Sequence, residues 1–174
     1  MRRILRRREI VADDWRHLGE DVEEGSALIV PLVELRKDPE RWRQWRGRLG
    51  VRLSSVDPVE ELAGDLPRLD LVAVEFPTPS DGRGYSAGRL LRERLGFRGE
   101  LRAVGAGVRQ DQVFLLARCG FDAIELASTE DPEAARRALD RYTIAYQPGS
   151  SEVALRRQRF LAQAGQLRGD PGLA

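Results

Sequence analysis

Residues 71–86 read Leu-Val-Ala-Val-Glu-Phe-Pro-Thr-Pro-Ser-Asp-Gly-Arg-Gly-Tyr-Ser, and this stretch decides the fold that we expect. The apolar run 71–74 predicts a buried strand that ends in the carboxylate of Glu75. Pro77 and Pro79 prevent the strand from continuing. A helical pattern covers residues 85–95, directly after the Asp-Gly-Arg-Gly turn. The stretch therefore predicts a strand, a glycine-rich turn and a helix in immediate succession.

The same order of strand and helix repeats along the chain. Further strands are expected at residues 28–33, 51–53, 100–104 and 123–127. Three helices are expected to begin with Asp-Pro, at Asp38, Asp57 and Asp131, where the aspartate is the N-cap and the proline is the first helical residue. Strands that alternate with helices pair in parallel through right-handed crossovers. We therefore predict an α/β protein of about five parallel strands with crossover helices, arranged as an open sheet or as a partial (βα) barrel.

Residues 1–26 are expected to form an amino-terminal arm. Two short strands, at 3–9 and 9–12, predict a small hairpin, and residues 13–15 resemble the start of a turn or short helix. Trp15 is expected to anchor the arm on the body of the protein, because large aromatic side chains are usually buried. The acidic residues of 19–26 lack the ordered spacing of a calcium loop, which favours a solvated connector over a metal site.

The remaining chain divides into two further regions. Residues 27–147 form the α/β body, in which the helix after Asp38 carries Trp42, Trp45 and Leu49 on one face and ends at Gly50. Residues 142–147 predict a short edge strand. Residues 148–174 are expected to form a carboxy-terminal helix, at 151–164, followed by a flexible tail.

Composition excludes several classes of protein. The net charge of +1 argues against a dedicated nucleic-acid binder, which normally has a basic excess. No apolar run is long enough to span a membrane, and no signal-peptide pattern is expected, so we expect a cytoplasmic protein. Cys119 and His17 are the only cysteine and histidine. Disulfides, cysteine-based metal sites and a Ser-His-Asp triad are therefore not expected, and the sequence identifies no cofactor.

Two glycine-bearing turns are expected to follow neighbouring strands at the edge where ligands of parallel sheets bind. Exposed backbone amides, a helix start and nearby arginines suit a small anion or the carboxylate of a partner. The predicted anion- or partner-binding residues are Asp81, Gly82, Arg83, Gly84, Tyr85, Ser86, Gly105, Gly107 and Arg109. A purely structural alternative remains open, in which Asp81 turns the chain and the glycines supply positive φ angles.

Glu75 is the candidate catalytic residue, because a carboxylate at the end of a strand suits general acid–base chemistry. The alternative is an ion pair between Glu75 and Arg83. Cys119 precedes a helix-ending glycine in apolar surroundings, which favours a buried side chain that fills space in the core over a nucleophile.

The residues around the glycine loop also resemble a known family. They are Glu75-Phe76-Pro77, residues 81–86 with their Asp-Gly-Arg-Gly-Tyr-Ser string, residues 89–92, residues 99–105 and residues 118–123. They are similar to a bacterial family of unknown function, catalogued as domain of unknown function nine-three-four, from the amino-terminal arm through Ile124. That family is often found beside genes for sulfite reductase, and some members are labelled oxidoreductases. The chain departs from the family pattern after Gly105, so only residues 81–86 are carried over.

The resemblance implies a role in reductive sulfur assimilation. We expect an accessory protein of sulfite reduction that binds a partner, such as sulfite reductase, or a small anion at residues 81–86. One alternative is an oxidoreductase or other small-molecule enzyme that uses Glu75 as an acid or base. Another is a non-catalytic subunit that forms a homo-oligomer.

Overall fold

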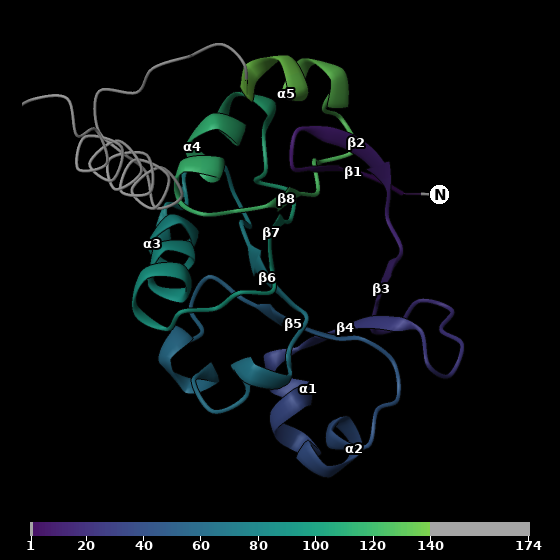
Figure 1. Cartoon of the computed structure of the whole chain (residues 1–174). Helices are drawn as coiled ribbons and strands as arrows, with labels where there is room; N and C mark the ends of the chain where they lie inside the picture. Colours follow the sequence, from purple (N-terminus) through teal and green to yellow (C-terminus); the bar gives the residue numbers. More distant parts are fainter. Residues whose placement is uncertain (1, 140–174) are drawn as a thin grey trace, which may run out of the picture.

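The computed structural model describes residues 2–139, which form one eight-stranded sheet with helices against one face (Figure 1). The sheet order is β2-β1-β8-β7-β6-β5-β4-β3, and strands β3 to β8 pair in parallel. The strands are β1 (Arg3–Arg6), β2 (Glu9–Ala12), β3 (Trp15–His17), β4 (Ala27–Pro31), β5 (Leu49–Leu53), β6 (Leu71–Glu75), β7 (Glu100–Val104) and β8 (Ala123–Ile124). The predicted α/β class, parallel strands and amino-terminal hairpin are confirmed, and the hairpin adds antiparallel strands to β8.

The helices between the strands are short. They are α1 (Leu32–Lys37), α2 (Pro39–Arg43), α3 (Arg83–Arg89), α4 (Val113–Arg118) and α5 (Pro132–Leu139). Three 3₁₀ turns, at Val59–Leu62, Leu66–Arg68 and Gln110–Gln112, and a π-helical turn at Leu90–Arg94 complete the connections. Asp38 caps α2 as predicted, because its Oδ1 accepts a hydrogen bond from the Arg41 amide at 3.1 Å.

A two-residue link forces the sheet to curl. Strands β2 and β3 lie at opposite edges of the sheet, yet only Asp13 and Asp14 separate them in sequence. Eight strands laid flat would place these edges roughly 34 Å apart, whereas this link spans at most about 10 Å. The sheet is therefore a half-barrel, and Figure 1 shows the purple segment between β2 and β3 crossing its open side.

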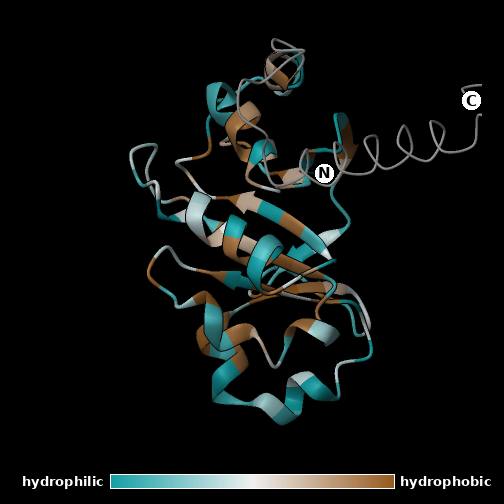
Figure 2. Ribbon diagram, turned by 60° about the vertical axis from the view of Figure 1, so that its left-hand side comes forward, coloured by the Kyte–Doolittle hydropathy of each residue, from teal (hydrophilic) through white to brown (hydrophobic). Residues whose placement is uncertain are grey.

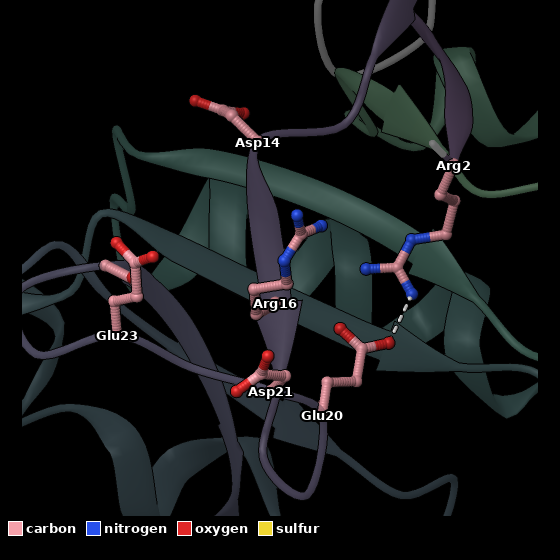
Figure 3. Close-up of a pocket in the computed structure, with 7 residues that line it drawn as sticks. Arg2, Asp14, Arg16, Glu20, Asp21 and Glu23 are labelled. Atoms are coloured by element: carbon pink, nitrogen blue, oxygen red, sulfur yellow. Dashed lines mark hydrogen bonds and ion pairs between the residues drawn. The ribbon is translucent and has the colours of Figure 1, made fainter.

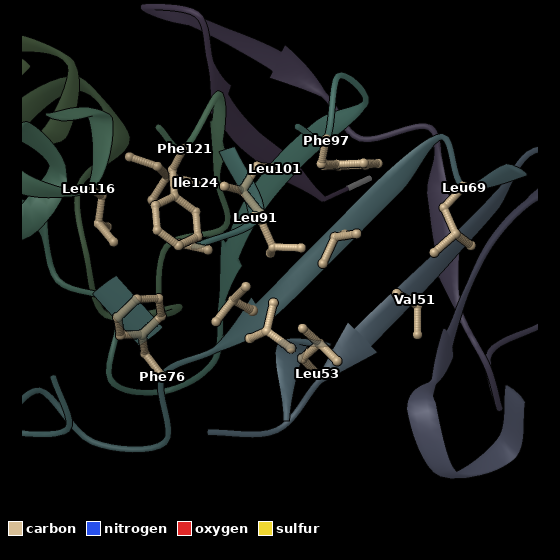
Figure 4. Close-up of a cluster of buried hydrophobic side chains, with 14 of the residues drawn as sticks. Val51, Leu53, Leu69, Phe76, Leu91, Phe97, Leu101, Leu116, Phe121 and Ile124 are labelled. Carbon is tan, nitrogen blue, oxygen red and sulfur yellow. The ribbon is translucent and has the colours of Figure 1, made fainter. Parts of the chain in front are cut away.

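The two faces of the curled sheet have different cores. The outer face packs against the helices through residues such as Val72, Leu101 and Phe121, and Figure 4 shows this cluster. The inner face is lined by a smaller group, including Trp15, Ile29 and Leu71. Figure 2 shows hydrophobic residues along the central strands and also on the helices, which carry hydrophobic and hydrophilic residues in turn. Strand residues therefore alternate between two buried faces rather than between core and solvent.

An ion pair is buried inside the curl. Arg102 of β7 is fully buried, and its Nη1 lies 3.0 Å from both carboxylate oxygens of Asp13, which is also fully buried. The same guanidinium donates to Glu100, and Asp13 also accepts a hydrogen bond from Arg2 Nε at 2.9 Å. Because buried charges are tolerated only when they are paired and hydrogen-bonded, this network fixes the arm against the centre of the sheet.

Three local predictions are wrong. Trp15 begins strand β3 instead of a turn or helix, and its ring, which is 2% exposed, lies over Gly50. Gly50 belongs to β5 and does not end a helix, because α2 stops at Arg43 and Leu49 already starts the strand. A Cβ on Gly50 would lie 3.2 Å from the Trp15 ring, so the glycine makes room for that ring. The helix predicted after Asp57 is a pair of 3₁₀ turns.

Other predictions concern the last part of the chain. The edge strand 142–147, the helix 151–164 and the tail from residue 165 lie outside the described residues. Within residues 2–139, no helix combines the length and the apolar character needed to cross a lipid bilayer.

Removal of one charge from the buried pair should destabilise the fold strongly. We expect Asp13→Ala to lower the free energy of unfolding by ~3–5 kcal/mol, because Arg102 would keep a buried charge without its main partner. Asp21→Ala, a substitution at an exposed residue of the next loop, is the control and should change it by less than about 0.5 kcal/mol. Guanidinium unfolding monitored by circular dichroism measures both.

The double variant Asp13→Ala/Arg102→Met separates charge from packing. It should recover part of the lost stability, since both buried charges are then absent. A loss below about 1 kcal/mol for Asp13→Ala would show that the pair does not hold the arm in place.

Candidate functional site

The glycine loop (residues 81–86) and the second glycine turn (residues 105–107) meet at one edge of the sheet. They follow β6 and β7, which are neighbours. The Gly107 amide donates to the Phe76 carbonyl at 2.8 Å, and the Gln112 side-chain amide donates to the Pro79 carbonyl at 3.0 Å. Residues 76–79, which lead into the glycine loop, therefore contact the second glycine turn and the 3₁₀ turn after it. Both glycine turns lie at the carboxyl ends of the strands, where parallel sheets place their ligands.

Arg83 is held by its own loop. Its Nε and Nη2 donate to the two carboxylate oxygens of Asp81 at 2.9 and 2.7 Å, and its backbone amide donates to Asp81 Oδ1 at 3.2 Å. These hydrogen bonds keep the pKa of Asp81 well below its usual range. The Arg83 side chain is 59% exposed, whereas that of Asp81 is 9% exposed. The loop thus presents a guanidinium whose direction is fixed before anything binds.

The predicted ion pair between Glu75 and Arg83 is wrong. Glu75 Oε1 instead accepts a hydrogen bond from Arg52 Nη2 at 2.7 Å, across the β5–β6 pair. Glu75 alternates with Leu71 and Ala73, so its side chain lies on the inner face of the half-barrel, away from the glycine loop. Its catalytic role stays a prediction.

Aromatic packing supports the glycine loop from below. Phe76 is 2% exposed and packs edge-to-face against Tyr85, with ring centroids 5.2 Å apart. A Cβ on Gly84 would lie 2.5–2.9 Å from the Phe76 ring, so only glycine fits there. Burial raises the pKa of the Tyr85 hydroxyl. Gly82 and Ser86 are exposed, which leaves the top of the loop open to a partner.

The second glycine turn has a structural explanation. Gly105 has φ +110°, and a Cβ on Gly107 would lie 2.4–2.5 Å from the Thr78 carbonyl group. Both glycines are therefore needed for the close approach of the two loops. Arg109, the third predicted residue here, pairs with Glu130 at 2.9 Å.

Sequence reasoning missed a second cluster on the inner face. His17 Nε2 lies 3.3 Å from Glu125 Oε2, and Arg2 Nη1 lies 3.5 Å from Glu125 Oε1. Burial alone would raise the pKa of Glu125, but the hydrogen bond from His17 and the charge of Arg2 lower it overall. The one available signal was position, since Glu125 follows a strand and His17 is two residues from the buried Trp15.

The acidic connector forms another hollow. Figure 3 shows its lining, in which the Arg2 guanidinium points toward Glu20. Glu20 also accepts a hydrogen bond from the His17 amide at 2.9 Å. Among residues 2–139, no group of three or more histidine, cysteine, aspartate or glutamate side chains is placed to hold a metal ion. Cys119 is buried, and burial raises the pKa of its thiol, which disfavours the nucleophilic thiolate.

The two glycines of the loop should respond differently to alanine. Gly84→Ala should lower the free energy of unfolding by ~1–3 kcal/mol, because the new methyl group would overlap the Phe76 ring. Gly82→Ala is the matched control: its φ is −83°, and a Cβ added there would have no atom within 4 Å, so stability should stay within about 1 kcal/mol of wild type. Thermal or guanidinium unfolding distinguishes them, and equal losses at both positions would contradict this account.

Comparison of the sequence with models of protein families gives a match, which includes the site described above. Residues 50–155 match the family described as bacterial protein of unknown function (DUF934). The matched region begins in β5, includes both glycine turns and extends past α5. It therefore reaches beyond Ile124 but does not include the arm, in contrast to the extent expected from the resemblance. No curated protein matches the chain. Because the matched region covers more than half of the 174 residues, the chain belongs to the DUF934 family of bacterial proteins of unknown function.

Proposed function

We propose that this chain is an accessory protein of assimilatory sulfite reduction that docks onto a partner, sulfite reductase, through the glycine loop. The observation that carries the proposal is the exposed Arg83 guanidinium, held in one direction by Asp81. A guanidinium that is fixed beforehand loses less conformational freedom when it meets a carboxylate. The family's association with sulfite reductase genes, implied by the resemblance, supports the choice of partner and a cytoplasmic location.

The rest of the loop suits docking to a protein surface. Its base is rigid, since Phe76 packs under Gly84 and accepts a hydrogen bond from Gly107. Its top carries Arg83 and the Ser86 hydroxyl and has no side chain at Gly82, so a partner backbone can approach closely. The recognised group is a carboxylate of the partner, and a small anion is the alternative ligand of the same donors.

Loss of Arg83 should weaken docking without loss of stability. We expect Arg83→Ala to weaken binding to sulfite reductase about tenfold, since arginine is among the commonest hot-spot residues of interfaces. Arg89→Ala is the matched control, because Arg89 is also 59% exposed, is paired to the carboxylate of Glu93 and belongs to the same helix. Biolayer interferometry with immobilised sulfite reductase measures both affinities.

Two results would contradict the proposal. One is the absence of binding by the wild-type chain, and the other is an equal loss for the Arg83 and Arg89 variants. Asp81→Ala gives an independent check: it leaves the arginine in place but removes its support, so binding should weaken less than in Arg83→Ala.

A second candidate function is favoured by the position of Glu75. Its carboxylate lies at the carboxyl end of a central parallel strand, is 28% exposed and contacts the Arg52 guanidinium at 2.7 Å. Such an acid beside a cation suits proton transfer on a small anionic substrate.

Glu75→Gln distinguishes the enzyme from the docking protein. In an enzyme, this variant should fold normally, bind sulfite reductase like wild type and fail to support growth of a deletion strain on sulfate. Growth equal to that of wild type would remove the catalytic role of Glu75. An absorbance spectrum of the purified protein tests for a bound flavin at the same time.

A further inference from the structure

A hollow opens where the chain segments after β7 and β8 separate. The Glu125 amide still donates to the Ala103 carbonyl at 2.9 Å, but the Ala127 amide reaches past the second glycine turn to the Val108 carbonyl at 3.4 Å. The space between them, the β7–β8 hollow, has a volume of about 600 Å³. Its lining includes Arg2, Arg3, Ala106, Glu125, Ser128 and Pro132. This volume lies within the range of small-molecule sites.

Arg3 supplies an available positive charge. It is exposed on β1 and forms no ion pair or side-chain hydrogen bond within the part of the chain that the structure describes. Arg2, by contrast, donates from its three nitrogens to Asp13, Glu20 and the Trp15 carbonyl. A ligand anion would therefore be held mainly by Arg3.

The carboxylates of the hollow are already matched by cations or donors. Glu125 lies between His17 and Arg2, at 3.3 and 3.5 Å. Glu130 pairs with Arg109 at 2.9 Å and accepts a hydrogen bond from the Gln110 amide. Arg3 is thus the arginine of the lining whose guanidinium is not already bound to a carboxylate of the described residues, which suits one negative charge on the ligand.

The walls also have apolar surface, contributed by Leu126, Ala127 and Pro132. We propose that the β7–β8 hollow binds a small organic monoanion, with its carboxylate or sulfonate group on Arg3 and a short apolar substituent against these residues. The proposal does not depend on docking through the glycine loop, since the two sites share only the second glycine turn.

Glu125 gives the site a charge preference. A glutamate carboxylate is negative at neutral pH, and although burial would raise the pKa of Glu125, the hydrogen bond from His17 and the charge of Arg2 lower it overall. A second negative charge on the ligand would be repelled by this group, so dianions should bind more weakly than monoanions.

The test is a titration of the full-length protein that is monitored by ¹H–¹⁵N NMR. The ionic strength is kept constant with chloride. Butyrate and methanesulfonate are the monoanionic probes, and sulfate is the dianionic one. The amide signals of Gly105 and Ala106, which line the hollow, should shift and saturate as a monoanion is added. The monoanion that binds more tightly identifies the preferred headgroup. Sulfate should bind more weakly than that monoanion.

Two variants assign the effect to the hollow. Arg3→Gln should weaken monoanion binding by about tenfold, because it removes the unpaired cation. Arg16→Gln, at an exposed arginine of β3 outside the hollow, is the matched control and should bind like wild type. Linear shifts without saturation for both monoanions, or equal losses in the two variants, would overturn the proposal. Glu125→Gln should reduce the difference in affinity between sulfate and the monoanions. An unchanged difference would show that Glu125 does not set the charge preference.

Discussion

The link between β2 and β3 ties together the two edges of the sheet, and the buried contact of Asp13 with Arg102 holds that link in place. Both parts are needed. A two-residue connection requires the edges to be close, and the ion pair fixes which residue of the central strand lies beneath the connection. Burial of charge is costly, and replacement of a whole buried ion pair by apolar residues is often neutral or stabilising. We interpret this ion pair as the feature that selects one position of the arm on the sheet. Other positions could bury a similar amount of apolar surface, but they would not pair Asp13 with Arg102.

The curl also explains why two separate regions of interest exist. Arg2 and His17 of the arm both meet Glu125 because the curl brings β3, at one edge of the sheet, toward the paired strands β1 and β8 on the inner side. The glycine loop lies outside this enclosure, where helix α3 begins. The fold thus places a partly open hollow, lined by both polar and apolar residues, and the exposed glycine loop at the carboxyl ends of the strands.

Local patterns predicted the parts of this fold that depend on local physics. Strand β7, the Asp38 cap, the glycine loop and its helix follow from side-chain alternation, capping chemistry and turn residues. Gly50 misled the prediction, because a glycine after a helical pattern usually marks its end, whereas here it accommodates the ring of Trp15. Contacts between distant residues could not be predicted. Arg102 and Asp13 are 89 residues apart, and His17 and Glu125 are 108 apart, so no spacing in the sequence indicates either pair.

The position of Asp13 in the chain has a consequence for biosynthesis. Asp13 leaves the ribosome before Arg102, its buried counter-charge, which is translated 89 residues later. Until then the Asp13 carboxylate and the apolar side of the hairpin cannot form their native contacts. The hairpin can therefore take its native position only after β7 and β8 have been synthesised.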